Sequence, residues 1–165
     1  MRRSEPEVLQ LAALAVWLGA AVFFSVAVAP ALFAVLPSRT LAGEVVGRLL
    51  PGIFYSGMLV ALFVAVTQFR AQSAWSWGWR ELGAVTMVAS CAIAQWLVAP
   101  RIATLRAEIG GPIEILPADD ARRMAFGRLH GASVAWLGLA MIAAIVIFVA
   151  AVRAMNPSDR RFHTL

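Results

Sequence analysis

Residues 129–152 read LHGASVAWLGLAMIAAIVIFVAAV and contain no Asp, Glu, Lys or Arg. A helix of about 20 apolar residues spans the hydrocarbon core of a bilayer, so this stretch predicts a transmembrane helix. Three more runs without a charged residue precede it, at residues 8–38, 49–69 and 82–100. Each of these runs is long enough to cross a bilayer, and the sequence therefore predicts four membrane-spanning helices.

The predicted fold is all-α, an integral membrane four-helix bundle, and residues 1–165 are expected to form a single membrane domain. We place the four spans at about residues 8–36, 49–69, 81–100 and 129–153, with a polar loop over residues 101–128. Because the spans take up more than half of the chain, too few residues remain for a separate soluble domain.

The composition excludes two other classes of protein. Hydrophobic residues make up 61% of the chain and charged residues only 14%, and the mean hydropathy is +0.80. Water-soluble domains carry about a quarter charged residues, and disordered chains are poor in apolar residues. The sequence is therefore neither that of a water-soluble globule nor that of a disordered chain.

The charges are placed as in a membrane protein. All 14 basic residues are Arg, and with 9 acidic residues they give a net charge of +5. They lie between the apolar runs and form no basic block, so we expect no nucleic-acid partner. Seven Arg fall on each side of the predicted membrane, and the positive-inside count is a tie. Because Arg2 and Arg3 precede the first span, we expect both termini in the cytoplasm.

The Ala-rich, Lys-free composition suggests a GC-rich genome, and we expect a bacterial protein of the inner membrane. Its first partner is then the lipid bilayer itself. A membrane-protein partner or a second copy of the chain is a further possible partner.

A few polar side chains fall at membrane depth on the side of the long loop. Arg48 and Tyr55 are seven residues apart and share a face of the second span, and His130 opens the fourth span at the same level. We predict one polar cluster in this leaflet, formed by Arg48, Tyr55, Gln95, Arg101, His130 and Ser133. Ionisable groups within a membrane protein are costly and tend to be functional. The alternative is that His130 bonds a neighbouring helix and that the Arg side chains reach the lipid phosphates.

Cofactor binding and catalysis are not expected. His130 and His163 fall on opposite sides of the membrane, so one subunit cannot ligate a haem through both; a haem with one protein ligand, or one shared by two subunits, stays open. The single cysteine, Cys91, allows neither an intramolecular disulfide nor a cysteine-based metal site. No acid in the spans could orient His130 as a base for Ser133. We therefore expect no enzyme, no cofactor and no metal.

Two pairs of glycines at a spacing of four residues are candidates for close helix packing. They are Gly43 with Gly47, before the second span, and Gly127 with Gly131, beside His130. Small residues at this spacing let helix backbones approach each other. We expect these glycines to serve packing within the bundle rather than dimerisation.

Five short motifs, in their order along the chain, resemble a known family. They are WLGAAVFF at 17–24, APALF at 29–33, FYSG at 54–57, VAPRI at 98–102 and FGRLHGAS at 126–133. In this order they resemble the transmembrane-protein-205-like domain, a four-span membrane domain without an established activity. The resemblance covers nearly the whole chain, and it implies that the positions to watch are Gly19, Pro30, Phe33, Tyr55, His130 and Ser133.

The leading functional hypothesis is a small non-enzymatic membrane protein that acts by binding a partner or a lipid through the polar cluster. One alternative is a component of a small-solute or ion transporter, with the cluster as its binding or gating point. A second alternative is a haem or quinone membrane enzyme.

Overall fold

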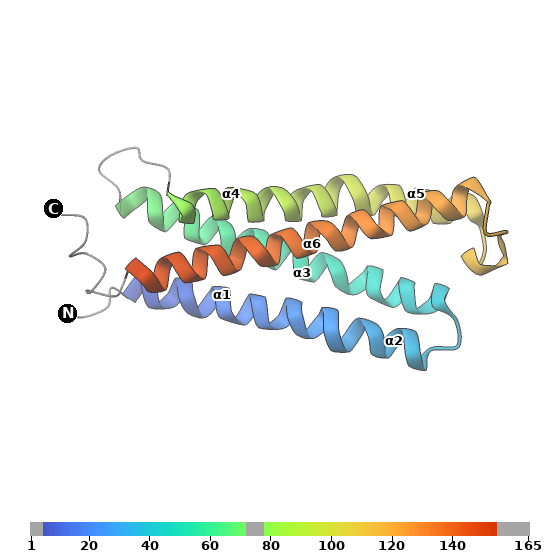
Figure 1. Ribbon diagram of the computed structural model, residues 1–165, viewed down its shortest axis with the longest axis horizontal. Helices are drawn as coiled ribbons and strands as arrows, with labels where there is room; N and C mark the ends of the chain where they lie inside the picture. Colours follow the sequence, from blue (N-terminus) through green and yellow to red (C-terminus); the bar gives the residue numbers. More distant parts are fainter. Residues whose placement is uncertain (1–4, 72–77, 155–165) are drawn as a thin grey trace.

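The computed structural model describes residues 5–71 and 78–154. Within this part every regular element is helical, and the helices join into four long rods, each antiparallel to the next along the chain (Figure 1). The element order is α1 (Glu5–Phe23), η1 (Phe24–Val28), α2 (Ala29–Val35), α3 (Arg39–Ala71), α4 (Trp79–Ala92), η2 (Ile93–Val98), α5 (Ala99–Ile109), η3 (Ile113–Ile115) and α6 (Ala121–Ala154).

Each rod is long and apolar enough to cross a membrane. The four candidate spans are Glu5–Val35, Arg39–Gln68, Trp79–Ile109 and Ala121–Ala154. Large apolar side chains point outward from them, with Val16 73% exposed, Leu59 68% and Ile142 60%. Such an apolar surface is unfavourable in water and is covered by lipid in a bilayer. The predicted all-α integral membrane four-helix bundle is confirmed.

The helices are longer than the apolar runs that predicted them. The second span, expected to begin at residue 49, already begins at Arg39, and the expected polar loop at 101–128 is mostly helical. That loop shortens because α5 continues to Ile109 and α6 begins at Ala121. Helix propensity does not end where the hydrocarbon core ends, and the extra turns project beyond it. α5 stops at Gly110, whose positive φ of 64° closes the last turn.

Two of the four rods contain a widened, π-helical turn. One is η1, which is followed by Ala29 and Pro30, and the other is η2, which is followed by Ala99 and Pro100. Proline has no N–H group, and its ring would clash with the carbonyl four residues earlier in a regular helix. In both rods that carbonyl lies within the widened turn, so the turn accommodates the proline without ending the helix.

The most extensive contact in the bundle joins α4 and α6. Gly83 on α4 faces α6 so closely that a Cβ atom at this position would lie 2.6 Å from Cγ1 of Ile147 and 3.3 Å from the carbonyl oxygen of Ala143. Ile147 itself is fully buried. The absence of a side chain at Gly83 thus sets how closely these two helices approach.

A similar contact joins α1 and α3. The indole of Trp17 occupies the space beside Gly57, and its Nε1 donates a hydrogen bond of 2.9 Å to the carbonyl oxygen of Ile53. This bond satisfies a buried indole N–H, which would otherwise cost free energy in an apolar environment.

The described chain begins and ends at the same end of the bundle, here the terminal end (Figure 1). A buried polar cluster joins three helices there. Arg80 donates a hydrogen bond of 2.7 Å to the amide oxygen of Gln10, and Gln10 donates to Thr67. With its amide oxygen turned toward the guanidinium, Gln68 accepts a bond of 3.1 Å from Nε of Arg80. At this end the buried polar groups therefore satisfy one another.

The contact at Gly83 generates a stability prediction. In Gly83→Ala the new methyl group collides with Ile147 and α6, and we expect a loss of about 1–3 kcal/mol in the free energy of unfolding. Thermal unfolding in detergent, followed by circular dichroism, measures the change. Gly52→Ala is the matched control, since a Cβ atom there has no atom within 4 Å, and it should leave the melting temperature unchanged or raise it. Equal melting temperatures for both variants would contradict the proposed packing.

Candidate functional site

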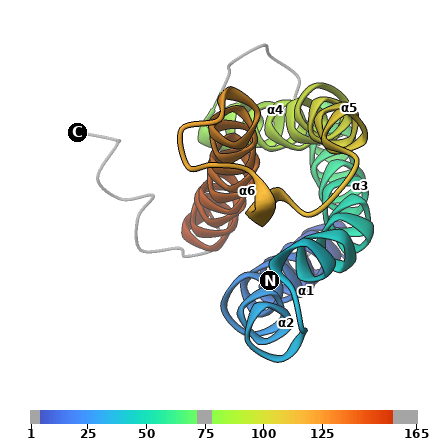
Figure 2. The same ribbon diagram turned by 90° about the vertical axis from the view of Figure 1, so that its right-hand side faces the viewer.

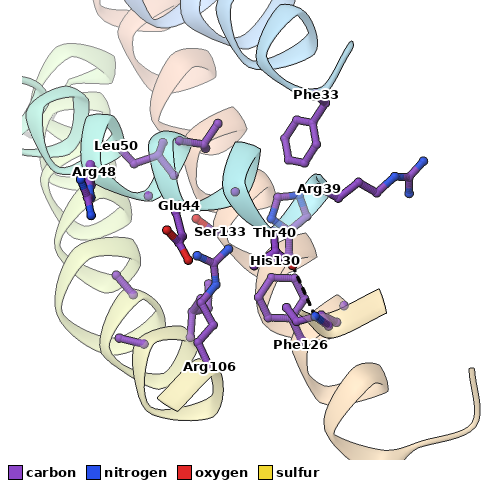
Figure 3. Close-up of a pocket in the computed structure, with 18 of the residues that line it drawn as sticks. Phe33, Arg39, Thr40, Glu44, Arg48, Leu50, Arg106, Phe126, His130 and Ser133 are labelled. Carbon is purple, nitrogen blue, oxygen red and sulfur yellow. Dashed lines mark hydrogen bonds between the residues drawn. The ribbon is translucent and has the colours of Figure 1, made fainter. Parts of the chain in front are cut away.

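A pocket of about 590 Å³ opens at the end of the bundle opposite the termini, here called the pocket end. Its lining residues come from α2, α3, η2, α5, η3 and α6 (Figure 3). The deepest lining residues on three walls are Phe54, Gln95 and Ser133. They lie 12 to 15 residues from the helix ends, so the pocket reaches about 20 Å along the helices.

The α3 wall follows one face of the helix. Its central residues are three or four positions apart: Thr40, Gly43, Gly47, Leu50 and Phe54. A Cβ atom at Gly47 would have no atom within 4 Å, so this glycine leaves space in the pocket. The same holds for Gly127 on α6. The expected role of Gly47, Gly127 and Gly131 in close helix packing is therefore wrong, because a Cβ atom at any of the three would have no atom within 4 Å. Gly43 is approached by the side chain of Arg106 and not by a helix backbone.

The α5 wall carries a half-buried cation. Ala99, Ile102, Ala103 and Arg106 line the pocket at helical spacing, and Arg106 extends across to α3. Its Nη2 lies where a side chain on Gly43 would be, 2.5 Å from the position of a Cβ atom. Nε of Arg106 is buried and has no hydrogen-bond partner.

An aromatic ring on α6 holds this guanidinium. Cζ of Arg106 lies 5.3 Å from the ring centroid of Phe126, within range of a cation–π interaction. The ring of His130 lies nearly parallel to that of Phe126, with 6.3 Å between the two centroids. Phe126 thus contacts both a permanent cation and the imidazole that the sequence singled out.

The α5–α6 connection is fixed to the pocket by two sets of bonds. Thr40 donates a hydrogen bond of 2.7 Å to the carboxylate of Glu114, and its hydroxyl accepts from the backbone N–H of Ile113 at 3.4 Å. Arg123 donates a bond of 2.7 Å to the carbonyl oxygen of Leu116. The Thr40 hydroxyl lowers the pKa of Glu114 below its ordinary value of 4.5, because it bonds the charged form.

Asp120, just before α6, forms bonds that fix the start of that helix. Its side chain accepts from the backbone N–H of Arg122 at 2.8 Å and forms an ion pair of 2.9 Å with the guanidinium of the same residue. These bonds lower the pKa of Asp120 to about 2. The carboxylate therefore caps α6 at every physiological pH.

The structure brings part of the predicted polar cluster together. Arg48, Gln95, His130 and Ser133 line the pocket, whereas Tyr55 and Arg101 do not. Along α3 the pocket narrows to Phe54, and Tyr55 beside it is 45% exposed on the outer surface.

Arg101 does not line the pocket because its spacing from Gln95 places it on another face of the helix. Six residues separate it from Gln95, which is about 1.7 turns and places the two side chains on different faces. Arg106 follows Gln95 by 11 residues, or about three turns, and it shares the lining face. The spacing could therefore have identified Arg106 as the pocket residue. Thr40, Glu114 and Phe126 had no comparable signal in the sequence.

The three positions that the family resemblance added have different surroundings. Phe33 lines the pocket from α2. Pro30 follows the widened turn η1 and is exposed. Gly19 is also exposed, and a Cβ atom there would have no atom within 4 Å.

Metal binding and nucleophilic catalysis each require particular arrangements of the polar residues that line the pocket within the described part of the chain. Among residues 5–71 and 78–154, no group of three or more His, Cys, Asp or Glu residues could hold a metal ion. Within the same ranges no hydrogen bond joins His130 to Ser133 or to a carboxylate. Cys91 is buried in the core, away from the pocket. His163 lies outside the described residues.

A four-helix membrane fold with a polar pocket at one end defines the class of this protein. Residues 12–110 match the family described as a domain of unknown function (DUF4149), and the protein belongs to that family. The match runs from within α1 to the glycine that ends α5, so the α2, α3 and α5 walls of the pocket fall inside it. No curated protein and no solved structure matches the chain.

The Thr40–Glu114 bond predicts how the connection responds to pH. Because the folded-state pKa of Glu114 is lowered, the stabilisation is complete above about pH 4.5 and is lost as the pH falls through the lowered pKa. Thr40→Val should raise the pKa of Glu114 toward its ordinary value, as carboxyl ¹³C NMR in micelles would measure. Thr104→Val, on an exposed residue outside the pocket lining, should leave that pKa unchanged. An unaltered pKa in Thr40→Val would show that the bond does not form.

Proposed function

We propose that this protein is a non-enzymatic membrane protein that acts by binding a lipid in the pocket. The observation that carries the proposal is the content of the pocket walls. Charged side chains lie toward its mouth, apolar side chains such as Leu50 and Phe54 line it further in, and the buried amide oxygen of Gln95 has no partner. Buried polar groups are normally hydrogen-bonded, so an unpartnered one in a cavity favours a bound ligand.

The contacts of Ser133 and His130 favour a binding function over a catalytic one. Catalysis at Ser133 would need a base in contact with its hydroxyl, and in the described part of the chain His130 stacks on Phe126 and makes no such bond. The same arrangement gives no support to the haem or quinone enzyme that the sequence left open.

Lipid binding is also favoured over solute transport. Beyond the pocket, the centre of the bundle is filled by fully buried side chains, among them Val64, Met87 and Ile147. The polar cluster of Gln10 and Arg80 then joins the helices at the terminal end. A transport path would have to open through this packed core, whereas a lipid needs only the pocket and the surrounding bilayer.

The proposal also includes the more specific family, the membrane and the orientation of the protein. The order of its motifs supports a transmembrane-protein-205-like domain, and its Ala-rich, Lys-free composition supports a bacterial inner membrane. With Arg2 and Arg3 ahead of the first span, the termini would lie in the cytoplasm. The pocket would then face the opposite leaflet. A partner protein or a second copy would bind the outer faces of the bundle.

Filling the pocket tests the proposal. In Gly127→Leu the new side chain would extend into the cavity, and we expect the amount of lipid retained after purification in mild detergent to fall about tenfold. Native mass spectrometry of the intact protein counts the retained lipids. Gly131→Leu is the matched control one turn further along α6, since Gly131 has free space around it but does not line the pocket.

Both variants should keep the circular dichroism spectrum of the wild type. Equal lipid retention by Gly127→Leu and Gly131→Leu would refute the proposal. Loss of a bound protein instead of a lipid from Gly127→Leu would favour the partner hypothesis.

A further inference from the structure

Four arginines line the pocket, and within residues 5–71 and 78–154 none of them forms an ion pair with a carboxylate. They are Arg39, Arg48, Arg106 and Arg123. The acidic lining residues are Glu44 and Glu114, so the four guanidinium groups exceed the carboxylates by two. Arg122 and Asp120 form an ion pair of 2.9 Å, and both residues lie outside the pocket lining.

Arg106 is the arginine whose position is fixed without a hydrogen bond. Its guanidinium lies against the ring of Phe126 on one side and over the backbone of Gly43 on the other. Figure 3 shows it in the middle of the pocket, with Glu44 pointing toward it from α3. Glu44 does not come within ion-pair distance, so the N–H donors of Arg106 are free for an anion. A planar guanidinium with free donors is well suited to binding a phosphate group.

Two other charged residues of the pocket already have hydrogen-bond partners. Arg123 donates to the backbone at Leu116, and the carboxylate of Glu114 accepts from Thr40. An anion at Arg106 would therefore displace no existing ion pair. It would also supply a partner for Nε of Arg106, which is buried and has none.

The level of Arg106 in the membrane matches that of a phospholipid headgroup. It lies six residues beyond Pro100, where the third apolar run ends, which is about 9 Å along the helix. Deeper in the pocket α3 contributes the apolar residues Leu50 and Phe54, and Gln95 and Ser133 add uncharged polar groups. The lining therefore changes from charged side chains at headgroup depth to apolar and uncharged polar side chains below it, in the order of the headgroup, ester and acyl regions of a phospholipid.

The α2 side of the pocket offers a route for the acyl chains. α2 packs mainly on α3 and makes no contact of similar extent with α6, and the two lie apart at the pocket end (Figure 2). On the α2 side the lining residue is Phe33, which is 41% exposed. Acyl chains can leave between these helices into the surrounding lipid. A free phosphate ion would leave the inner half of the pocket, beside Leu50 and Phe54, unfilled.

We infer that the pocket binds the headgroup phosphate of an anionic phospholipid, with Arg106 as its main ligand. This inference rests on the proposed function and names the class of lipid. The side-chain NH₂ of Gln95 and the hydroxyl of Ser133 lie deeper on the same walls and would donate to the ester carbonyls of the glycerol backbone. The unpartnered amide oxygen of Gln95 would accept from a hydroxyl of the lipid or from a bound water. Basic pockets between transmembrane helices at headgroup depth are a known means of selecting anionic lipids.

The test compares two phospholipids that have the same acyl chains. The delipidated protein is titrated with phosphatidylglycerol or with phosphatidylcholine, and native mass spectrometry measures the bound fraction. The wild type should prefer phosphatidylglycerol by about fivefold, as expected for one unpaired arginine at the membrane surface. In Arg106→Gln the preference should fall below about twofold. Arg128→Gln, which removes an exposed arginine of α6 outside the pocket lining, should keep it.

A second variant covers the case in which Arg106→Gln does not fold. Gly43→Ala keeps every charge but places a methyl group where Nη2 of Arg106 lies. The end of that flexible side chain must then move, and the preference should fall at least about twofold while the melting temperature changes little. A preference that is unchanged in Gly43→Ala, with the guanidinium displaced, would overturn the role of Arg106.

The remaining outcomes separate this inference from the proposed function. Equal binding of the two lipids by the wild type overturns the headgroup assignment, and if Gly127→Leu still blocks retention, lipid binding itself stands. Failure of the wild type to retain either lipid overturns both. If inorganic phosphate at millimolar concentration displaces phosphatidylglycerol completely, the pocket is a site for free phosphate and not for a lipid.

Discussion

The close approach of α4 and α6 at Gly83 is the contact on which the rest of the bundle depends. Because Ile147 fits against a residue without a side chain, α6 lies tightly along α4 through the centre of the bundle. α6 then meets α1 at the terminal end, whereas at the pocket end it lies apart from α2 (Figures 1 and 2). The pocket is a consequence of this crossing, since helices that meet at one end enclose space at the other.

The two ends of the bundle differ in whether their buried polar groups have hydrogen-bond partners. At the terminal end Gln10, Thr67 and Arg80 satisfy one another across three helices. At the pocket end Nε of Arg106 and the amide oxygen of Gln95 are buried without a partner. In an apolar environment an unpaired polar group is costly. Oγ of Ser90 is also buried without a partner, but it lies outside the pocket lining, whereas Arg106 and Gln95 line a cavity that can hold a ligand. This contrast is the main support for a ligand at the pocket end.

Much of the fold was predictable, and less of the site. The four apolar runs gave the number and approximate place of the helices, but not their ends, since α3 and α6 continue through polar residues that favour helix as well. For the site, residues on one helix could be grouped by period, and that period already favours Arg106 over Arg101 as a neighbour of Gln95. Contacts between helices, such as Arg106 with Phe126 or Thr40 with Glu114, left no pattern in the sequence.

The sequence by itself determined that the chain crosses a membrane four times, because span length and hydropathy are properties of consecutive residues and are set by the thickness of the bilayer. Only the tertiary structure decided which polar side chains share a pocket. That depends on how each helix is rotated, on the widened turns before Pro30 and Pro100, and on where missing side chains let helices touch. Gly83 and Gly127 are both glycines in apolar helices, yet one brings two helices together and the other leaves a cavity open, because their neighbours differ in space and not in sequence.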